Sequence, residues 1–213
     1  GITDTTIPNV WDGETVNTDW YTDDATTFSL FQPADLAGLA KLVNEGCSFE
    51  GKSISLFVDL DMNNKPWIPI GISDNTSFKG TFNGNYSHIK NLNPVLSDNM
   101  NVAGLFGISD GTIHQVIVSG EFDVSCDKIS TLYVGAVCGI NKGTIQDCRS
   151  CVDVEVGMNY ESETMTNAYV GGIVGDLLGT ISSCQNYGLI TAENVNTNEK
   201  AYLHIGGISG GAS

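Results

Sequence analysis

Two aspartates, Asp59 and Asp61, alternate with Leu60 at the end of a strand-like run, so we expect both carboxyl groups on one face of that strand. Such a pair can bind Ca²⁺, with Asn63 or Asn64 supplying further oxygen ligands. Two neighbouring carboxyl groups are also what the hydrolysis of sugars requires. A chain with 25 acidic residues produces such pairs by chance, so solvated residues at a strand end are the alternative. The sequence therefore predicts no obligatory cofactor and leaves calcium at Asp59 and Asp61 as the single candidate.

Aromatic residues form a second candidate set. An aromatic ring can stack on the apolar C–H surface of a sugar, and exposed Trp and Tyr are enriched in binding patches. Trp20 and Tyr21 lie near the N-terminus, whereas Tyr160 and Tyr187 lie in or beside segments that differ between repeats. These four residues are the predicted ligand contacts. The alternative for Trp20 and Tyr21 is that, with Trp11, they pack the N-terminal segment onto a helix.

Histidine and cysteine give little support to catalysis or to a zinc site. Cys148 and Cys151 form a CxxC pair, but a zinc site would need a second such pair or suitably spaced histidines. His88, His114 and His204 are isolated in the sequence, and no nucleophile-elbow signature occurs. We therefore predict no catalytic residue and no enzymatic activity. The even number of cysteines permits disulfides, but buried thiols are expected and no pairing is assigned.

The composition of the chain limits its partners. Its 25 Asp and Glu against 9 Lys and Arg give a formal net charge of −16. Such a surface repels phosphate backbones and anionic lipid, so nucleic-acid binding is not expected. No run of 18 apolar residues occurs, so no membrane-spanning segment is expected. The chain begins without Met and ends in "HIGGISGGAS", and we expect a fragment of a longer protein in which more repeats or domains follow Ser213.

One short pattern recurs through the second half of the chain. It reads "VAGLFGISDGTI" from Val102, "VGAVCGINKGTI" from Val134 and "VGGIVGDLLGTI" from Val170, and a fourth copy begins at Ile205. The Gly-Thr-Ile triplets begin at positions 111, 143 and 179, which gives spacings of 32 and 36 residues. Periods of this length are typical of solenoids and propellers. Each unit alternates apolar and polar residues as strands do, and it is short for a four-stranded propeller blade, so we predict a β-solenoid.

The repeat divides one continuous domain into segments. A leader and strand are expected over 1–32, and a helix with the first β coils over 33–100. The repeats then occupy 102–133, 134–169, 170–204 and a truncated 205–213. Pro33 and Gly46 bound the one clear helix, which we expect to cover the open end of the β stack. Strands are expected over 53–60 and near 67–70, and Asn83-Gly84 predicts a tight turn in the first coil or in a lead-in hairpin.

The segments "DLAGLAKLVNEGCSFEGKSISLFVDLDM", "FKGTFNGNYSHIKNL" and "VGGIVGDLLGTISSC" resemble those of proteins that carry GLUG repeats. These occur in large bacterial surface proteins, often of the Bacteroidetes type, and in some immunoglobulin A1 proteases. The resemblance extends from Trp11 to Gly210 and implies an all-β, right-handed β-helix outside the cell, with adhesion or binding as its function. It supplies no catalytic residues, and the HExxH zinc motif of the protease members is absent here.

We therefore expect a non-enzymatic, extracellular binding or adhesion module of a bacterial cell-surface protein, with a host or environmental glycan or protein as its partner. A structural stalk is one alternative, and it predicts no saturable ligand. An accessory domain of a surface protease or of a carbohydrate-active enzyme is the other. A degenerate β-helix enzyme predicts a groove lined by at least two close carboxylates.

Overall fold

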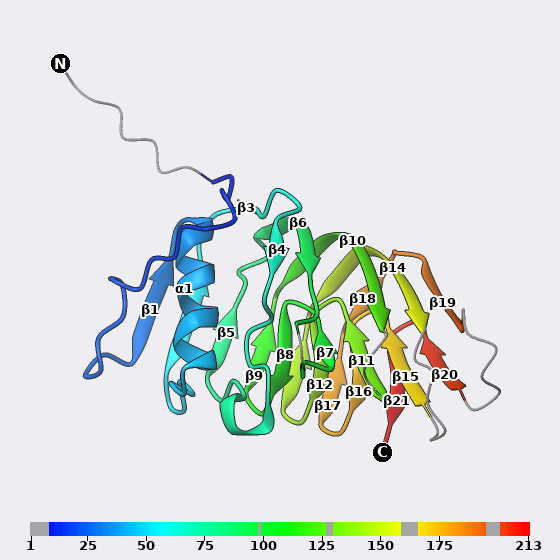
Figure 1. Cartoon of the computed structure of the whole chain (residues 1–213). Coiled ribbons are helices and arrows are strands. Elements are labelled where there is room, and N and C mark those ends of the chain that lie inside the picture. Colours follow the sequence, from blue (N-terminus) through cyan, green and yellow to red (C-terminus); the bar gives the residue numbers. More distant parts are fainter. Residues whose placement is uncertain (1–8, 98, 127–129, 159–165, 195–200) are drawn as a thin grey trace.

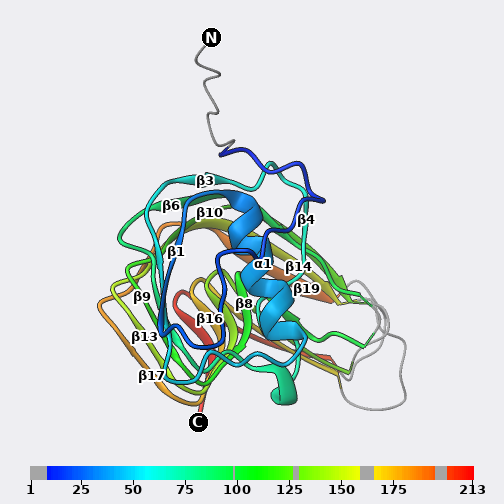
Figure 2. The ribbon, with the colours of Figure 1, turned by 90° about the vertical axis from the view of Figure 1, so that its left-hand side faces the viewer.

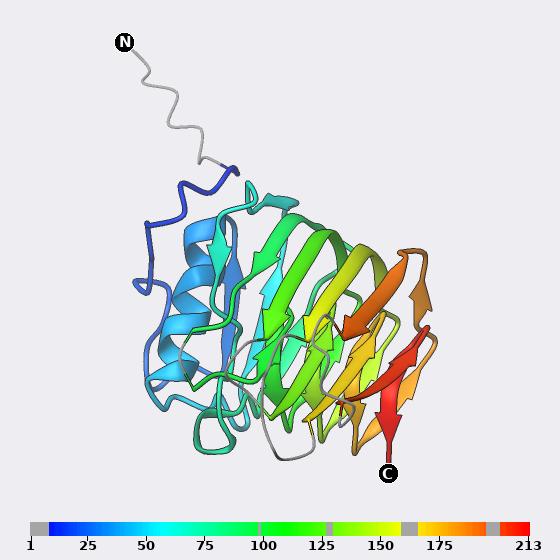
Figure 3. The same ribbon diagram turned by 45° about the vertical axis from the view of Figure 1, so that its right-hand side comes forward.

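The computed structural model of the chain describes residues 9–97, 99–126, 130–158, 166–194 and 201–213 (Figure 1). The fold is a right-handed parallel β-helix of about four turns, with one α-helix among these residues, as the sequence predicts. The strands form four parallel sheets, and each full coil contributes strands to all four of them. Helix α1 (Pro33–Asn44) lies at one end of the stack and the C-terminal strands lie at the other (Figures 1 and 3).

Two of the sheets begin in the N-terminal half of the chain. Sheet 1 contains, in spatial order, β1 (Thr27–Leu30), β2 (Ser53–Leu56), β5 (Thr81–Asn83), β9 (Thr112–His114), β13 (Thr144–Gln146) and β17 (Thr180–Ser182). Sheet 2 contains β3 (Leu60–Asp61), β4 (Pro66–Trp67), β6 (His88–Pro94), β10 (Ile117–Cys126), β14 (Arg149–Met158), β18 (Gln185–Asn186) and β19 (Ile190–Asn194).

The other two sheets are built by the recurring Val-Gly-Gly-Ile-Val-Gly pattern. Sheet 3 contains β7 (Val102–Ala103), β11 (Thr131–Gly135), β15 (Thr166–Gly171) and β20 (Ala201–Gly206). Sheet 4 contains β8 (Phe106–Ser109), β12 (Cys138–Asn141), β16 (Val174–Leu177) and β21 (Ser209–Ala212). A single-turn 3₁₀ helix, η1 (Asp74–Thr76), interrupts the segment between β4 and β5.

Equivalent residues of successive repeats lie directly on one another in the core. Ile113, Ile145 and Ile181 are register partners in sheet 1, which confirms the alignment of the Gly-Thr-Ile triplets. Along β14, buried and exposed side chains alternate strictly up to Val156, as expected of a strand with one face in the core. The buried face of the coils is therefore a set of columns of like residues, and burial of these columns is the main stabilising term.

The Asn83-Gly84 turn forms a corner of the coil, and the hairpin alternative is wrong. The strands on either side of it, β5 and β6, belong to different sheets, and both pair with their neighbours in parallel. The chain turns through Asn85 and Tyr86, which have φ values of 50° and 58°. A side chain at position 84 would place Cβ 2.3 Å from the carbonyl oxygen of Gln115 in the next coil, so only glycine fits there.

Helix α1 covers the N-terminal end of the core, as predicted (Figure 2). Leu36, Leu39 and Val43 on its inner face are fully buried. The carboxylate of Asp35 in its first turn is only 4% exposed and accepts hydrogen bonds from the backbone amide of Phe31 at 2.9 Å and from two side-chain amides. This carboxylate ties the segment before the helix, and through Asn17 the leader, to the first turn of the helix.

The last described coil is less well covered than the coils before it. Ile181, Ile190 and Leu203 are partly exposed, whereas their register partners Ile145, Val154 and Ala168 are buried. The core is therefore more completely buried in the middle of the described stack than in its last coil.

This difference predicts unequal effects of one substitution at two positions of the same column. Ile145→Ala should lower the free energy of unfolding by about 3 kcal/mol because it leaves a cavity in a buried column. Ile181→Ala should lower it by only about 1 kcal/mol because that side chain is already partly hydrated. Urea unfolding of both variants, followed by circular dichroism, measures the two costs. Equal costs would contradict the graded burial.

Candidate functional site

The predicted ligand contacts Trp20 and Tyr21 lie in an aromatic cluster with Phe28 and Phe49. The ring of Trp20 is 5.5 Å from Phe28 and 6.0 Å from Phe49, and the ring of Tyr21 is 5.3 Å from both. These contacts fit the packing alternative, because both side chains are partly buried against β1 and the segment after α1. Trp11 packs elsewhere, against Trp67, with 5.8 Å between the ring centres.

Tyr187 is the predicted contact that the structure leaves most accessible, and Tyr160 lies outside the described residues. The side chain of Tyr187 is 66% exposed beside β18. Its hydroxyl donates a hydrogen bond to the side-chain oxygen of Gln185 at 3.0 Å, and the guanidinium of Arg149 lies 5.9 Å from the ring centre. Tyr187 is therefore available for stacking on the outer face of sheet 2.

Asp59 and Asp61 lie on either side of the fully buried Leu60, and both carboxylates accept hydrogen bonds. The Oδ1 of Asp59 accepts the backbone N–H of His88 at 2.7 Å. The Oδ1 of Asp61 accepts the backbone amide of Asn63 and the side-chain amide of Asn91, both at 2.8 Å. Across the described ranges, no three His, Cys, Asp or Glu side chains gather as a metal site. The two carboxylates accept hydrogen bonds from the turn at Asn63 and from the next coil. Calcium binding stays a prediction.

A row of carboxylates on sheet 2 is the most distinctive surface, and sequence reasoning missed it. We call Glu121 and Asp123 on β10, with Asp153 and Glu155 on β14, the acidic face. The register places Glu121 beside Asp153 and Asp123 beside Glu155. All four side chains are exposed, while the residues that alternate with them are buried. Adjacent strands are about 4.8 Å apart, so like charges stand side by side and repel each other.

Strand β19 extends the acidic face to the next coil. Leu189, just before this strand, is 67% exposed, and its backbone amide donates to the Oδ1 of Asp153 at 2.8 Å. Thr191 is the register partner of Glu155, and Glu193 follows it on the outside. Two adjoining depressions of about 240 and 480 Å³ are lined by residues of β10, β14 and β19. The signal in the sequence was "EFDV" and "DVEV" at the same place in two repeats, 32 residues apart.

His88 and Ser119 meet on the same sheet, although they are isolated in the sequence. The Nε2 of His88 lies 2.8 Å from the Oγ of Ser119, the first contact of a nucleophile and a base. A catalytic triad needs a carboxylate on the other ring nitrogen, but Asp59 accepts the backbone amide of His88 instead. Burial lowers the pKa of His88, which favours the neutral form of its ring. The contact joins β6 to β10 and does not complete a hydrolytic site.

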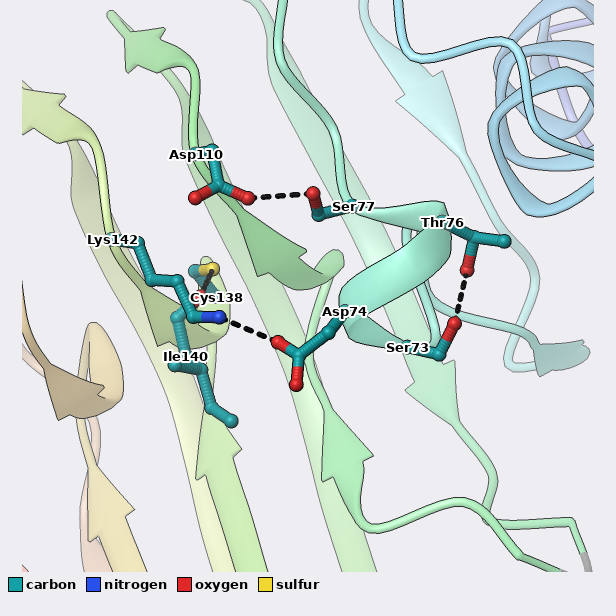
Figure 4. A network of polar contacts seen from close by, with 8 residues as sticks. All are labelled: Ser73, Asp74, Thr76, Ser77, Asp110, Cys138, Ile140 and Lys142. Carbon is teal, nitrogen blue, oxygen red and sulfur yellow. Dashed lines mark hydrogen bonds and ion pairs between the residues drawn. The ribbon is translucent and has the colours of Figure 1, made fainter.

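A polar network fixes the turn that contains η1 (Figure 4). Asp74 on η1 forms an ion pair of 2.5 Å with Lys142 after β12, and this contact raises the pKa of Lys142. Ser77 donates to the Oδ2 of Asp110 at 2.6 Å, which ties the same turn to the end of β8. Cys138 beside this network is fully buried, and burial raises the pKa of its thiol. The Ser77 contact joins adjacent coils, and the pair of Asp74 with Lys142 reaches across the coil that contains β8.

An aromatic ladder lies along sheet 3. The rings of Tyr133, Tyr169 and His204 stack in register, with centres 5.3 Å apart for the first pair and 4.4 Å for the second. Burial, and then the charge of Asp176, raise the pKa of Tyr133. Because each ring covers the next, this ladder offers less open aromatic surface than Tyr187 does.

Comparisons of the chain with protein-family models, curated proteins and solved structures gave no match. The described part of the chain contains no helix long and apolar enough to cross a lipid bilayer. The case for a function therefore depends on the surfaces, among which the acidic face aligns like charges in register.

Repulsion across the acidic face predicts that reversal of one charge stabilises the protein. Glu155→Lys should raise the free energy of unfolding by about 0.5 kcal/mol, because an attractive pair with Asp123 replaces a repulsive one. Urea unfolding at low salt measures the gain, and it should shrink in 0.5 M NaCl (roughly a 4 Å screening length). A loss of stability in Glu155→Lys would show that the carboxylates do not repel each other as placed.

Proposed function

We propose that the chain is a non-enzymatic binding module and that the acidic face is its contact surface for a basic protein or peptide. The observation that carries this proposal is the alignment of Glu121 with Asp153 and of Asp123 with Glu155. Side-by-side like charges destabilise a sheet, so their clustering suggests a use outside the fold. A cationic partner would relieve the repulsion that the free protein carries.

Two further features support binding at this face. Leu189 and Tyr187 are 67% and 66% exposed at its border, and apolar and aromatic side chains beside charge are typical of recognition surfaces. The net charge of −16 would also steer a basic partner toward the molecule and speed its association. A glycan remains the second ligand class, with Tyr187 as the ring on which a sugar would stack.

The extracellular, bacterial-surface location belongs to the same proposal. Its support is the likeness of the recurring Val-Gly-Gly-Ile-Val-Gly and Gly-Thr-Ile pattern to GLUG repeats, together with the repetitive β-helix that this pattern forms. A β-helix presents the same outer surface over successive coils, which suits either a binding face or a stalk.

A carbohydrate-active enzyme is the second candidate, because the depression beside β10 and β14 is lined by close carboxylates. Glycoside hydrolysis uses two carboxyl groups on either side of the scissile bond. Glu121 and Asp153 would be the pair in that case. Release of reducing ends from acidic and neutral polysaccharides, lost in Glu121→Gln and in Asp153→Asn, would favour this candidate over a binding module.

The binding proposal predicts a saturable, salt-sensitive interaction with basic peptides. Lysine-rich and arginine-rich peptides are immobilised, and their binding of the whole chain is measured by biolayer interferometry. Glycans and mucins are immobilised and measured in the same way for comparison. A quadruple variant of the acidic face keeps the hydrogen-bond acceptors and removes the charge. Its substitutions are Glu121→Gln, Asp123→Asn, Asp153→Asn and Glu155→Gln. It should raise the dissociation constant roughly tenfold, or about 1.4 kcal/mol.

A control variant removes the same charge from the other end of the molecule, where Glu14, Asp19, Asp24 and Glu50 are exposed. It should bind nearly as well as the unmodified chain. Equal losses in both variants would mean that net charge alone drives the interaction, and this would overturn the assignment to the acidic face. The absence of saturable binding to any probe would favour the stalk.

A further inference from the structure

Two cysteines, Cys148 and Cys184, occupy the same corner in successive coils. The residues around them are in register, with Gln146 beside Ser182 and Arg149 beside Gln185. The backbone amide of Gln185 donates to the carbonyl oxygen of Cys148 at 3.0 Å. Backbones in this register are about 4.8 Å apart, which is within the separation of roughly 4.4–6.8 Å that a disulfide spans.

The two side chains also have the same orientation and touch each other. The sulfur of each thiol lies 3.3 Å from the carbonyl oxygen two residues before it, that of Gln146 for Cys148 and that of Ser182 for Cys184. The two thiols are hydrogen-bonded to each other. Cys148 is 1% exposed, whereas Cys184 is partly exposed in the last coil. One member of the pair is therefore accessible to a reagent and the other stands directly behind it.

The surroundings make the accessible thiol the more acidic of the two. The hydrogen bond from Cys148 lowers the pKa of Cys184 to about 7, although burial and Asp147 act in the opposite direction. The same contact and burial raise the pKa of Cys148. Arg149 and Tyr86 line a cavity of about 170 Å³ that opens beside Cys148. Cys184 is therefore the nucleophile of the pair, and Cys148 is the thiol that resolves a mixed disulfide.

We propose that Cys148 and Cys184 form a disulfide between the last two described coils by exchange with a small-molecule or protein disulfide. The thiolate of Cys184 attacks one sulfur of the oxidant, forms a mixed disulfide and releases a thiolate. Cys148 then attacks the Sγ of Cys184 and releases the second thiolate. Two cysteine thiols are oxidised, one disulfide is reduced to two thiols, and the two protons pass from the cysteines to the released thiolates.

The bond has a structural consequence for the stack of coils. It would join the incompletely covered last coil to a buried position of the coil before it, and so restrict the unfolded chain over the intervening repeat. The equivalent residue one coil earlier is Val116, which is fully buried, so the thiol pair is confined to these two coils. The inference goes beyond the proposed function and does not depend on it.

Peptide mapping tests the pairing directly. The probe is oxidised glutathione, and the protein is the whole chain with Cys151→Ser, which leaves Cys184 as the one cysteine in the tryptic segment 150–200. Cys148 lies in segment 143–149, so a linked pair of these segments identifies the bond. We expect this pair as the main product, and a rise in Tm of roughly 5–10 °C that dithiothreitol reverses.

Valine variants supply the matched controls. Cys148→Val and Cys184→Val introduce the residue that Val116 already places in this column, so both should fold. Each should lose the linked peptides and the gain in Tm, and Cys148→Val should stop at the mixed disulfide of Cys184 with glutathione. A main product in which Cys148 or Cys184 is linked to another cysteine would overturn the pairing. So would a folded Cys151→Ser protein that forms no linked peptides with oxidised glutathione. An unchanged Tm on bond formation would overturn its role as a cross-link.

The rate of the exchange gives a pH test of the assigned nucleophile. Because the thiolate is the attacking species, the rate should rise with pH and level off above about 7, the pKa of Cys184. The measurement is the initial rate of glutathione incorporation in Cys148→Ser, whose hydroxyl can still donate to Cys184. A rate that continues to rise until pH ~8.5, the ordinary pKa of cysteine, would contradict activation of Cys184 by the residue at position 148.

Discussion

The parallel, in-register stacking of successive coils at about 4.8 Å is the constraint on which the rest of the molecule depends. Each residue of a repeat has its counterpart from the next repeat as its nearest neighbour, as with Ile113, Ile145 and Ile181. The spacing also limits the corners, because a Cβ at Gly143 would lie 2.0 Å from the carbonyl oxygen of Gly111. Apolar columns, glycine corners and the regular period are therefore consequences of one geometry.

The same geometry acts on the outer surface, where it brings together groups that would otherwise stay apart. A single exposed carboxylate interacts weakly with its surroundings, but a carboxylate repeated in the next coil becomes one of a pair at close distance. Glu121 with Asp153 and Cys148 with Cys184 arise in the same way, from one side-chain type used at matched positions. In a β-helix, function can therefore arise from repetition along the stack as well as from loops.

The sequence was sufficient for the features that repeat and for the helix. Local periodicity and helix-boundary residues were enough to predict three features. These are the alignment of the Gly-Thr-Ile triplets, the burial of alternate residues from Val152 to Val156, and the helix that begins at Pro33. At Asn83-Gly84 the sequence left a coil corner and a hairpin open, because a turn signal does not say whether the following strand returns or continues around a corner; the corner is what forms. The contact of His88 with Ser119 could not be predicted, because it depends on a register between coils of different length.

The two ends of the stack show how differently an exposed coil can be stabilised. At the N-terminal end, α1 adds burial, since Leu36, Leu39 and Val43 cover the first coil and lower the free energy of the folded state. At the other end, Ile181 and Leu203 stay partly hydrated, so little further stability comes from packing. A bond between Cys148 and Cys184 would act there on the unfolded chain instead, by reducing its conformational freedom.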